Sequence, residues 1–417
     1  MKRCCVVVDG VAGGARLGKS FRARGYRCVH VRTFPNSDER LLVDFDATQF
    51  DELLDYDGTN FELFAHRLVD TYNPAFAAVG CEEGVELGDC LNEVIGRPHH
   101  GSELRKRLRH KHLMNRAVRQ AGLPVPASLL ARTRDEAAQL AEELRSWPLV
   151  IKPKDSSGAD GVRLCHNLED VQTIANLLFS KPNIMNERNT EIVIQSYVPG
   201  RKMTVDTISD GGEHFVTSVW LDQVVVTQGG SPVMRGARLL PGSRPDALAA
   251  AQAARQCLDA LGIQHGPAMM EFIEYNNAFY FIEINARLCG LPVWHEEFQR
   301  ALNFTQDQIY AAWLCNEVDL RRILAQPYHL ARHVWWVAAL STRDAVVRNF
   351  HGLDCISRLP SFVCILSCAK GGERIRPTED LFSFPLTALL SNADEGKIIR
   401  DFNAFETIGD DVLFSFH

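Results

Sequence analysis

The sequence lacks the long hydrophobic runs and the excess of basic charge that mark membrane proteins and nucleic-acid-binding proteins. No apolar run among its 417 residues approaches the roughly 20 residues of a membrane-spanning helix. Its 45 Lys and Arg residues are outnumbered by 52 Asp and Glu residues, and the formal net charge of −7 argues against nucleic acid as a main partner. We therefore expect a globular protein of two or three domains, with neither a membrane nor nucleic acid as its partner.

The sequence also lacks paired cysteine motifs. Its twelve cysteines are scattered without any CxxC pair or zinc-finger spacing, which fits reduced thiols better than disulfides or a metal centre. The apolar run Cys4–Val8 is short and is followed at once by Asp9, so we do not expect a signal peptide there. These observations predict a cytoplasmic protein.

What the sequence does contain is a pair of segments that can gather oxygen ligands. Residues 269–275 and 279–284 are rich in β-branched and aromatic residues and are separated by a turn-prone Asn-Asn-Ala segment, which predicts a hairpin. With a three-residue loop, Glu271 lies opposite Glu283, and Asn285 points to the same face as Glu283. Facing carboxylates repel unless a cation lies between them, and this ligand set suits Mg²⁺. A two-residue turn would put the carboxylates on opposite faces, and a solvated hairpin with incidental acids is the alternative.

Two other segments are candidates for binding nucleotide phosphates. Residues 149–151 predict a buried strand that carries Lys152 at its end, followed by a loop of small residues whose backbone amides can wrap an anion. An ordinary flexible turn is the alternative for this loop. Residues 105–122 predict a basic helix that ends at Gly122. We interpret its basic residues as a solvated face, with the exception of Lys111.

In this order the segments resemble the ATP-grasp superfamily. The resemblance covers residues 105–292 and consists of HKHLMNRAVRQAGLPVP, VIKP with its Gly-rich loop, IQSYVPG and FIEINAR. It implies that the chain binds ATP together with Mg²⁺ or Mn²⁺, and that Arg287 neutralises the phosphoryl group in transfer. The matching positions are Lys111, Lys152, Ser156, Ser157, Gly158 and Gly161 for the phosphates, Gln195, Tyr197 and Val198 for adenine, and Glu271, Glu283 and Asn285 for the metal.

The resemblance also implies an α/β (α+β) architecture in three parts. Residues 1–104 alternate strands with helical stretches, as expected for the open parallel sheet of a pre-ATP-grasp domain. Residues 105–320 are expected to form the ATP-grasp domain, with a lid at about 127–200, and residues 321–417 a strand-rich C-terminal part with a mixed or antiparallel sheet. The chain departs from the family at Lys202, where a glutamate commonly holds the ribose hydroxyls.

The activity implied by the resemblance is the joining of a carboxylate to an amine through an acyl phosphate, with small molecules as the partners and a homodimer as a possible assembly. The His-Gly pair before the acidic strand, the EINARLCG segment and the C-terminal extension look most similar to L-amino acid ligases. An ATP-grasp carboxylase, a purine-pathway enzyme and a non-catalytic nucleotide-binding scaffold are the alternatives. Candidate substrate residues are His265, Gly266, Leu291, Arg235 and Arg238.

Several of these substrate candidates have a second interpretation. His265 is equally consistent with a histidine satisfied inside the core, and Arg235 and Arg238 with surface charges. We expect Gly266 to mark a close approach of the backbone, and Leu291 to line the pocket near the acyl group.

One further motif is a phosphate-loop pattern near the start of the sequence. Gly13–Ser20 reads GGARLGKS and matches GxxxxGKS, which would make Lys19 and Ser20 nucleotide ligands of a P-loop hydrolase or kinase. The chain reaches Gly25 within five residues and then enters the next predicted strand, so there is no room for the long helix that such a loop opens. We therefore expect a short amphipathic helix that begins inside the pattern and carries Leu17.

Overall fold

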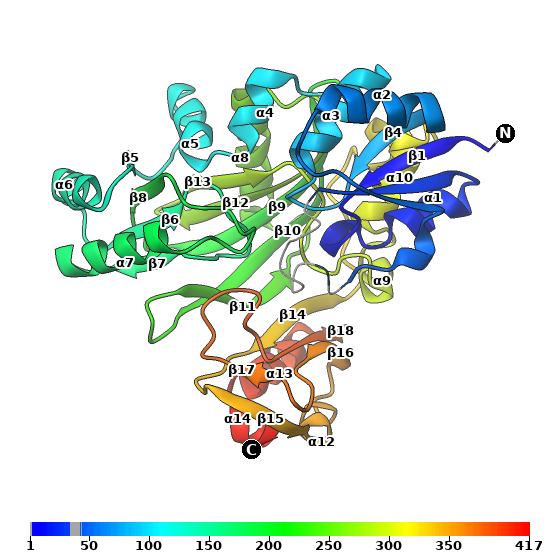
Figure 1. Ribbon diagram of the computed structural model, residues 1–417. Coiled ribbons are helices and arrows are strands. Elements are labelled where there is room, and N and C mark those ends of the chain that lie inside the picture. Colours follow the sequence, from blue (N-terminus) through cyan, green and yellow to red (C-terminus); the bar gives the residue numbers. More distant parts are fainter. Residues whose placement is uncertain (1, 34–41, 43) are drawn as a thin grey trace.

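The first part of the chain is a parallel sheet, as predicted. The structure, a computed structural model, describes residues 2–33, 42 and 44–417 (Figure 1). Four parallel strands lie in the order β3-β2-β1-β4, and every residue of β1 is buried, which is typical of a parallel sheet covered on both faces. The elements are β1 Cys4–Val8, β2 Arg27–Arg32, β3 Glu52–Asp55, β4 Pro74–Val79, α1 Leu17–Ala23, α2 Phe61–Tyr72, α3 Val85–Ile95 and the 3₁₀ turns Ala12–Gly14 and Ala47–Gln49. Strand β3 was not predicted.

The phosphate-loop pattern is used for packing. Helix α1 begins at Leu17, inside the pattern as expected, and is only seven residues long. A Cβ atom at Gly13 would overlap the carbonyl oxygen of Cys289, and one at Gly14 would overlap the backbone of Gly80. These glycines therefore allow the turn before α1 to pack against two distant backbone segments, which explains them without a phosphate.

The predicted helix over residues 105–122 is wrong, because two shorter helices take its place: α4 Ser102–Leu108 and α5 Lys111–Gln120. The backbone is extended at His110, with φ −124° and ψ 98°, and the N–H of Lys111 donates to the carbonyl of Lys154 at 3.1 Å. This contact with another part of the chain overrides the local helical preference. The break puts Lys111 at the first position of α5.

A small antiparallel sheet lies in the residues that we predicted as the lid. Its strands lie in the order β5-β8-β6-β7, with bounds β5 Ser128–Ala131, β6 Leu149–Pro153, β7 Arg163–Cys165 and β8 Ile192–Ser196. Two helices, α6 Arg134–Leu144 and α7 Leu168–Ser180, pack against it through a cluster that includes Ala141, Ala175 and Ile151 (Figure 1). The predicted buried strand that carries Lys152 is β6.

The largest sheet spans both the second and the third predicted parts of the chain. Eight strands, each antiparallel to its neighbours, lie in the order β13-β12-β9-β10-β11-β14-β18-β16. They are β9 Arg201–Asp210, β10 Glu213–Val226, β11 Pro232–Leu239, β12 Gly266–Tyr275, β13 Ala278–Asn285, β14 His333–Ala339, β16 Phe362–Cys368 and β18 Leu386–Asn392. The C-terminal strands thus continue the sheet that contains the hairpin β12–β13.

The remaining elements are short or lie at the edges. A three-stranded sheet in the order β17-β15-β19 joins β15 Ala345–Phe350, β17 Arg374–Ile375 and β19 Phe414–Phe416. The other helices are α8 Pro245–Leu261, α9 Glu296–Leu302, α10 Gln306–Leu314, α11 Leu320–Ile323, α12 Leu353–Ile356, α13 Glu395–Glu406 and α14 Asp410–Leu413. Among the described residues, no helix is both long and apolar enough to cross a membrane.

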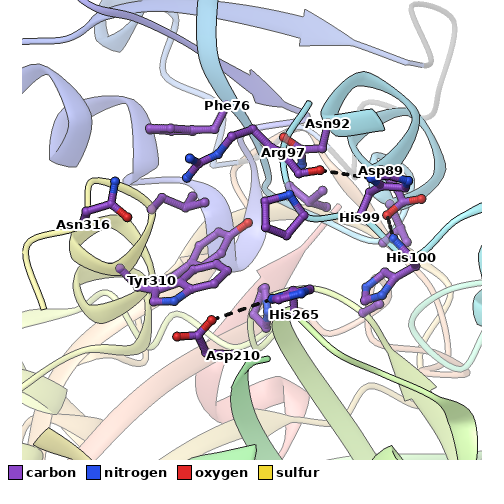
Figure 2. Close-up of a pocket in the computed structure, with 18 of the residues that line it drawn as sticks. Phe76, Asp89, Asn92, Arg97, His99, His100, Asp210, His265, Tyr310 and Asn316 are labelled. Atoms are coloured by element: carbon purple, nitrogen blue, oxygen red, sulfur yellow. Dashed lines mark hydrogen bonds and ion pairs between the residues drawn. The ribbon is translucent and has the colours of Figure 1, made fainter. Parts of the chain in front are cut away.

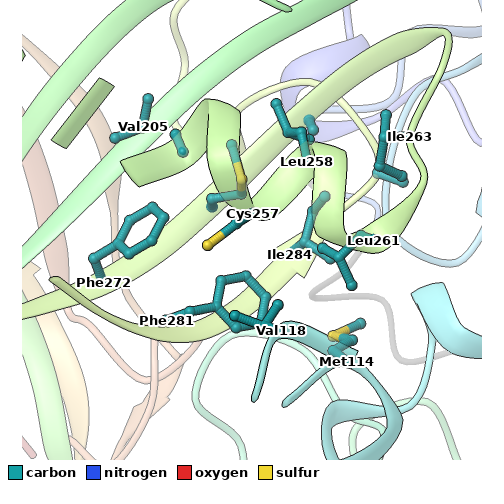
Figure 3. Packing of buried hydrophobic residues seen from close by; sticks show 14 of the residues in the cluster. Met114, Val118, Val205, Cys257, Leu258, Leu261, Ile263, Phe272, Phe281 and Ile284 are labelled. Carbon is teal, nitrogen blue, oxygen red and sulfur yellow. The ribbon is translucent and has the colours of Figure 1, made fainter. Parts of the chain in front are cut away.

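A shared hydrophobic core fixes α5 and α8 on the hairpin β12–β13. Met114 and Val118 of α5 meet Leu258 of α8 and Phe281 and Ile284 of β13 in one buried cluster (Figure 3). Apolar burial is worth about 25 cal/mol per Å², so this contact strongly constrains where α5 lies. It thereby positions Lys111, at the start of α5, beside the hairpin.

Candidate active site

The hairpin brings the two predicted carboxylates face to face, but its loop differs from the prediction. Tyr275 pairs with Ala278, so the loop contains only Asn276 and Asn277, both with positive φ (50° and 61°), as in tight two-residue hairpins. The expected three-residue loop is therefore wrong. With a regular ladder, a two-residue loop would place the carboxylates on opposite faces.

A β-bulge restores the facing pair. Phe272 pairs with Phe281, while Glu271 pairs with Glu283, so Ile282 is one extra residue in β13. Such a bulge shifts the register by one position and turns every later side chain to the other face. Met269 pairs with Asn285, which puts Asn285 two residues beyond Glu283 on the same strand face. The prediction that Glu271 faces Glu283 is confirmed, but the bulge, and not a three-residue loop, brings them opposite each other.

The bulge is held by a side chain that the sequence reasoning missed. The Asn115 amide on α5 donates to the carbonyl oxygen of Ile282 at 2.9 Å and to that of Lys111 at 3.1 Å. Asn115 is buried. Asn115 thus connects the bulge to the helix that carries Lys111. No local sequence pattern predicts this contact.

Two lysines lie around Glu283. The Lys111 ammonium is 3.4 Å from the Glu283 carboxylate and donates to the carbonyl of Ser156 at 3.1 Å. Lys152 is 4% exposed, and burial lowers its pKa to about 8 although the charge of Glu283 acts in the opposite direction. Burial raises the pKa of Glu283, but the lysine charges outweigh it and bring that pKa down to about 2. Glu283 is therefore ionised at neutral pH.

Lys202, the departure from the family pattern, is balanced by two carboxylates. Its ammonium lies 2.9 Å from Glu271 and 3.7 Å from Asp222, the residue directly opposite it on β10. Burial lowers the pKa of Lys202, but the charges of Glu271 and Asp222 outweigh this effect and raise it above its ordinary value. Burial raises the pKa of Asp222 to about 6, although Lys202 acts against it, and Thr204 donates to its carboxylate at 2.9 Å. The sequence reasoning missed Asp222.

The Ser/Gly loop is folded into a tight turn. The Ser156 hydroxyl donates to Asp160 at 2.8 Å, and Gly158 and Gly161 have positive φ (63° and 70°), which favours glycine. The carbonyl of Gly158 accepts from the N–H of Leu381 at 3.0 Å. A Cβ atom at Gly158 would overlap the ring of Phe382. The loop is therefore packed against the C-terminal part of the chain.

The predicted catalytic arginine is linked to the first domain. Arg287 donates to the carbonyl of Leu288 at 2.9 Å, and its Nε lies 3.4 Å from the carboxylate of Glu82, which follows β4. Arg109 lies 3.2 Å from the same carboxylate and 2.9 Å from Asp155. Burial raises the pKa of Glu82, while the two guanidinium groups oppose that rise. The interpretation of Arg109 as a solvated charge is wrong, because its side chain is only 13% exposed and is paired with the buried Glu82.

Gln195 and Tyr197 differ sharply in exposure. Gln195 on β8 is 3% exposed, and its side-chain nitrogen has no hydrogen-bond partner in the described part of the protein. Tyr197 is 39% exposed, and its N–H donates to the carbonyl of Pro148 at 3.3 Å. Val198 follows, with its carbonyl accepting from Gly200 at 3.0 Å. A buried amide without a partner is a feature that a bound base would satisfy.

The two arginines predicted to bind a substrate are in contact with the C-terminal part of the chain. Arg235 donates to the backbone carbonyl of Glu406, and Arg238 pairs with Glu395 and lies 5.5 Å from the ring centre of Trp335. Both glutamates belong to α13. The Nε atoms of both arginines are nevertheless buried without a hydrogen-bond partner among the described residues, so a role in binding a substrate stays a prediction for both.

The other substrate candidates are separated by the fold. Leu291 packs against a cluster that includes Trp220 and Cys289. His265 and Gly266 instead lie at the beginning of β12, in the wall of a cavity. The expected close backbone approach at Gly266 is wrong, because a Cβ there would meet open space and the φ of 89° is what favours glycine.

The residues of the hairpin fit a hard divalent ion. Among the residues that the structure describes, no three His, Cys, Asp or Glu side chains cluster as metal ligands. The candidate ligands are two carboxylates, which face each other, and the amide of Asn285. Asn285 is buried, and its side-chain nitrogen has no hydrogen-bond partner within the described residues. Few protein ligands, all with oxygen donors, suit Mg²⁺, which keeps water and phosphate oxygens in its other positions.

Comparisons with known proteins agree with this geometry. Residues 108–291 match the model of the ATP-grasp domain. A dapdiamide A synthase from Enterobacter agglomerans is 29% identical over 297 residues, covering 69% of this chain and 68% of that protein. A D-alanine–D-alanine ligase from a Ruegeria species is 28% identical over 216 residues, covering 49% of this chain and 65% of that protein.

A solved structure shares the entire fold. The L-amino acid ligase from Bacillus licheniformis superposes over 100% of both chains with a TM-score of 0.77, at 15% sequence identity. Residues 108–291 therefore match an ATP-grasp domain, and the chain as a whole is similar in sequence and in fold to ATP-dependent carboxylate–amine ligases.

Proposed function

We propose that the protein joins the carboxylate of an L-amino acid to the amine of a second amino acid or another small molecule, through an acyl phosphate. The observation that carries this proposal is the pair Glu271 and Glu283, held face to face by the bulge and surrounded by lysines. Phosphoryl transfer needs positioning and charge neutralisation more than covalent help from the protein, and this site offers both.

Separate groups of residues would bind the metal and the ATP phosphates. Glu271, Glu283 and Asn285 would hold Mg²⁺ or Mn²⁺, which neutralises phosphate charge when bound. Lys111 and Lys152 would bind the ATP phosphates, because both ammonium groups lie around Glu283 and Lys111 also reaches the Ser156 carbonyl. The backbone amides of Ser156, Ser157, Gly158 and Gly161 would cover those phosphates.

The adenine and the transferring phosphoryl group would meet other residues. Gln195, Tyr197 and Val198 would surround the base, and the unpartnered amide of Gln195 supports this placement. Arg287 would stabilise negative charge on the phosphoryl group in the transition state. Its contact with Glu82 would hold the guanidinium in position.

The reaction balances without a protein nucleophile. A carboxylate oxygen of the substrate attacks the γ-phosphorus, the bond from that phosphorus to the β–γ bridging oxygen breaks, and ADP leaves. The amine then attacks the acyl carbon, phosphate leaves with the acyl oxygen, and the amine loses a proton. The packed lid loop would exclude water, which otherwise hydrolyses the acyl phosphate.

The test is a matrix of paired L-amino acids and simple amines with ATP and Mg²⁺, followed by ADP release and mass spectrometry of the products. We expect an amide product in equal amount to ADP, and its loss in Glu283→Gln. If the products are instead those of an ATP-grasp carboxylase or a purine-pathway enzyme, the proposal of an amino acid ligase is wrong. Stoichiometric ATP binding without ADP release would support a non-catalytic scaffold.

We also propose a cytoplasmic location. The twelve free cysteines support it, because disulfides are rare in the reducing cytosol.

A further inference from the structure

A cavity of about 340 Å³ lies between the first domain and one end of the large sheet (Figure 2). Its wall includes residues of β4 and α3, the loop that follows α3, the end of β9, the beginning of β12, and α10. Small-molecule pockets begin at roughly 300 Å³, so the cavity has room for a ligand about the size of an amino acid. It does not include any residue that we assign to ATP or to the metal.

One side of the cavity is aromatic. Phe76 of β4 and Tyr310 of α10 are almost fully buried, and Tyr310 stacks on Trp313 with ring centres 6.1 Å apart and an angle of 22° between the planes. Leu314 extends this apolar surface. A planar apolar group would pack well against such a surface.

The cavity also contains a guanidinium without an anionic partner. Arg97 is half-buried, and within the described residues it forms no ion pair and its Nε is buried without a hydrogen-bond partner. Figure 2 shows its guanidinium between Phe76 and Tyr310. The Nδ1 atom of the neighbouring His100 is likewise buried without a partner among these residues. The buried Nε of Arg97 therefore has unused capacity for an acceptor such as a carboxylate oxygen.

The carboxylates of the cavity do not supply that anion. Asp89 accepts from the Arg105 guanidinium at 2.8 Å and from the N–H of His100 at 2.6 Å. Asp210 lies 3.8 Å from the Nδ1 of His265. Asp210 is half exposed, and neither acidic group forms an ion pair with Arg97.

We propose that this cavity is a second ligand site, which binds a small carboxylic acid or amino acid with a planar, apolar side chain. The carboxylate pairs with the Arg97 guanidinium, a geometry that arginine favours, and the apolar group packs against Tyr310 and Trp313. This inference does not depend on the proposed reaction.

Along β12 the cavity is separated from the carboxylates of the hairpin. Gly266 precedes Glu271 by five residues along β12, which corresponds to about 17 Å. Ala286 nevertheless lines the cavity and lies between Asn285 and Arg287 in the chain. Because the walls come from both domains, a bound ligand would also hold the first domain, with its Glu82, against the sheet.

The experiment measures binding of phenylacetate and L-phenylalanine by calorimetry, without ATP or substrates, to the full chain. Phenylacetamide, which has the same ring but no charge, is the ligand control. Arg97→Gln removes the guanidinium, and Arg67→Gln removes an exposed arginine of the same domain as the matched control. Binding of ADP reports whether each variant is intact.

We expect at least one of the two carboxylates to bind with a single site, more tightly than phenylacetamide. Arg97→Gln should weaken it roughly tenfold or more and leave ADP binding unchanged, while Arg67→Gln changes neither. Glu283→Gln should not alter carboxylate binding. Absence of saturable binding at millimolar concentration, equal binding to Arg97→Gln, or loss of binding in Glu283→Gln would each overturn the proposal.

Discussion

Replacing Lys202 by methionine tests how the protein tolerates its departure from the family pattern. Methionine keeps much of the side-chain length and removes the charge. The ammonium lies 2.9 Å from Glu271, a separation at which opposite charges attract by about 6 kcal/mol at an effective dielectric constant of 20, and 3.7 Å from Asp222. Removing one partner of a buried ion pair costs about 3–5 kcal/mol, and the side chain of Asp222 is only 2% exposed.

The cost should depend on pH, because Asp222 can take up a proton. Its pKa is about 6 with Lys202 present, and the loss of that positive charge raises it further. In the Lys202→Met protein the carboxyl group of Asp222 is therefore mostly neutral near pH 6. At pH 8 this carboxyl group either is a buried charge without a partner or must take up a proton at a cost in free energy. We expect a loss of about 3 kcal/mol in unfolding free energy at pH 8 and a smaller loss at pH 6.

Urea denaturation of the metal-free protein at the two pH values measures this effect, with an unchanged m-value as the sign that the native state is intact. Adding Asp222→Asn to Lys202→Met removes both partners and should recover part of the stability at pH 8. A Lys202→Met protein as stable as the original at pH 8 would refute the reasoning, and so would a double variant that is less stable than Lys202→Met.

Three further predictions follow from the site. Asn115→Ala should lower the unfolding free energy by about 1–3 kcal/mol, because the carbonyl of Ile282 in the bulge loses its donor; urea unfolding measures this loss. The same variant should bind Mn²⁺ more weakly in a metal titration. The low pKa of Glu283 stabilises the protein above pH 4.5, and this stability is lost as the pH falls toward 2. In Glu283→Gln the unfolding free energy should therefore depend less on pH over that interval. Gly158→Ala should make the lid loop more susceptible to limited proteolysis, since its Cβ meets Phe382, whereas Gly122→Ala, with a similar φ but open space, should not.

The hairpin shows how far the sequence could predict the site. Alternation along two strands was enough to propose that Glu271 faces Glu283, because side chains two residues apart share a face. The loop length was misjudged, and the bulge at Ile282 was not foreseen. The bulge is supported by Asn115, which lies 167 residues away in the chain, and such a contact leaves no local pattern to read.

The same limit explains the misjudged charges. Arg109 and Lys111 belong to one basic segment, and helical periodicity alone cannot distinguish a solvated guanidinium from one that meets Glu82 of another domain. The helix break at His110 also depends on a contact with the lid. By contrast, the parallel strands of the first domain and the short helix at Leu17 were predictable, because local hydrophobic patterns determine them.

The contact between the lid loop and the C-terminal part has a consequence for biosynthesis. Arg163, just after the loop, donates to Glu379, 216 residues later in the chain, and Gly158 accepts from Leu381. Contacts of such long sequence separation form late in folding, and a chain emerging from the ribosome gains this one only when its last tenth appears. The Ser/Gly loop therefore reaches its packed conformation only in a nearly finished protein, and a truncated chain that lacks Leu381 and Phe382 cannot hold the loop in this way.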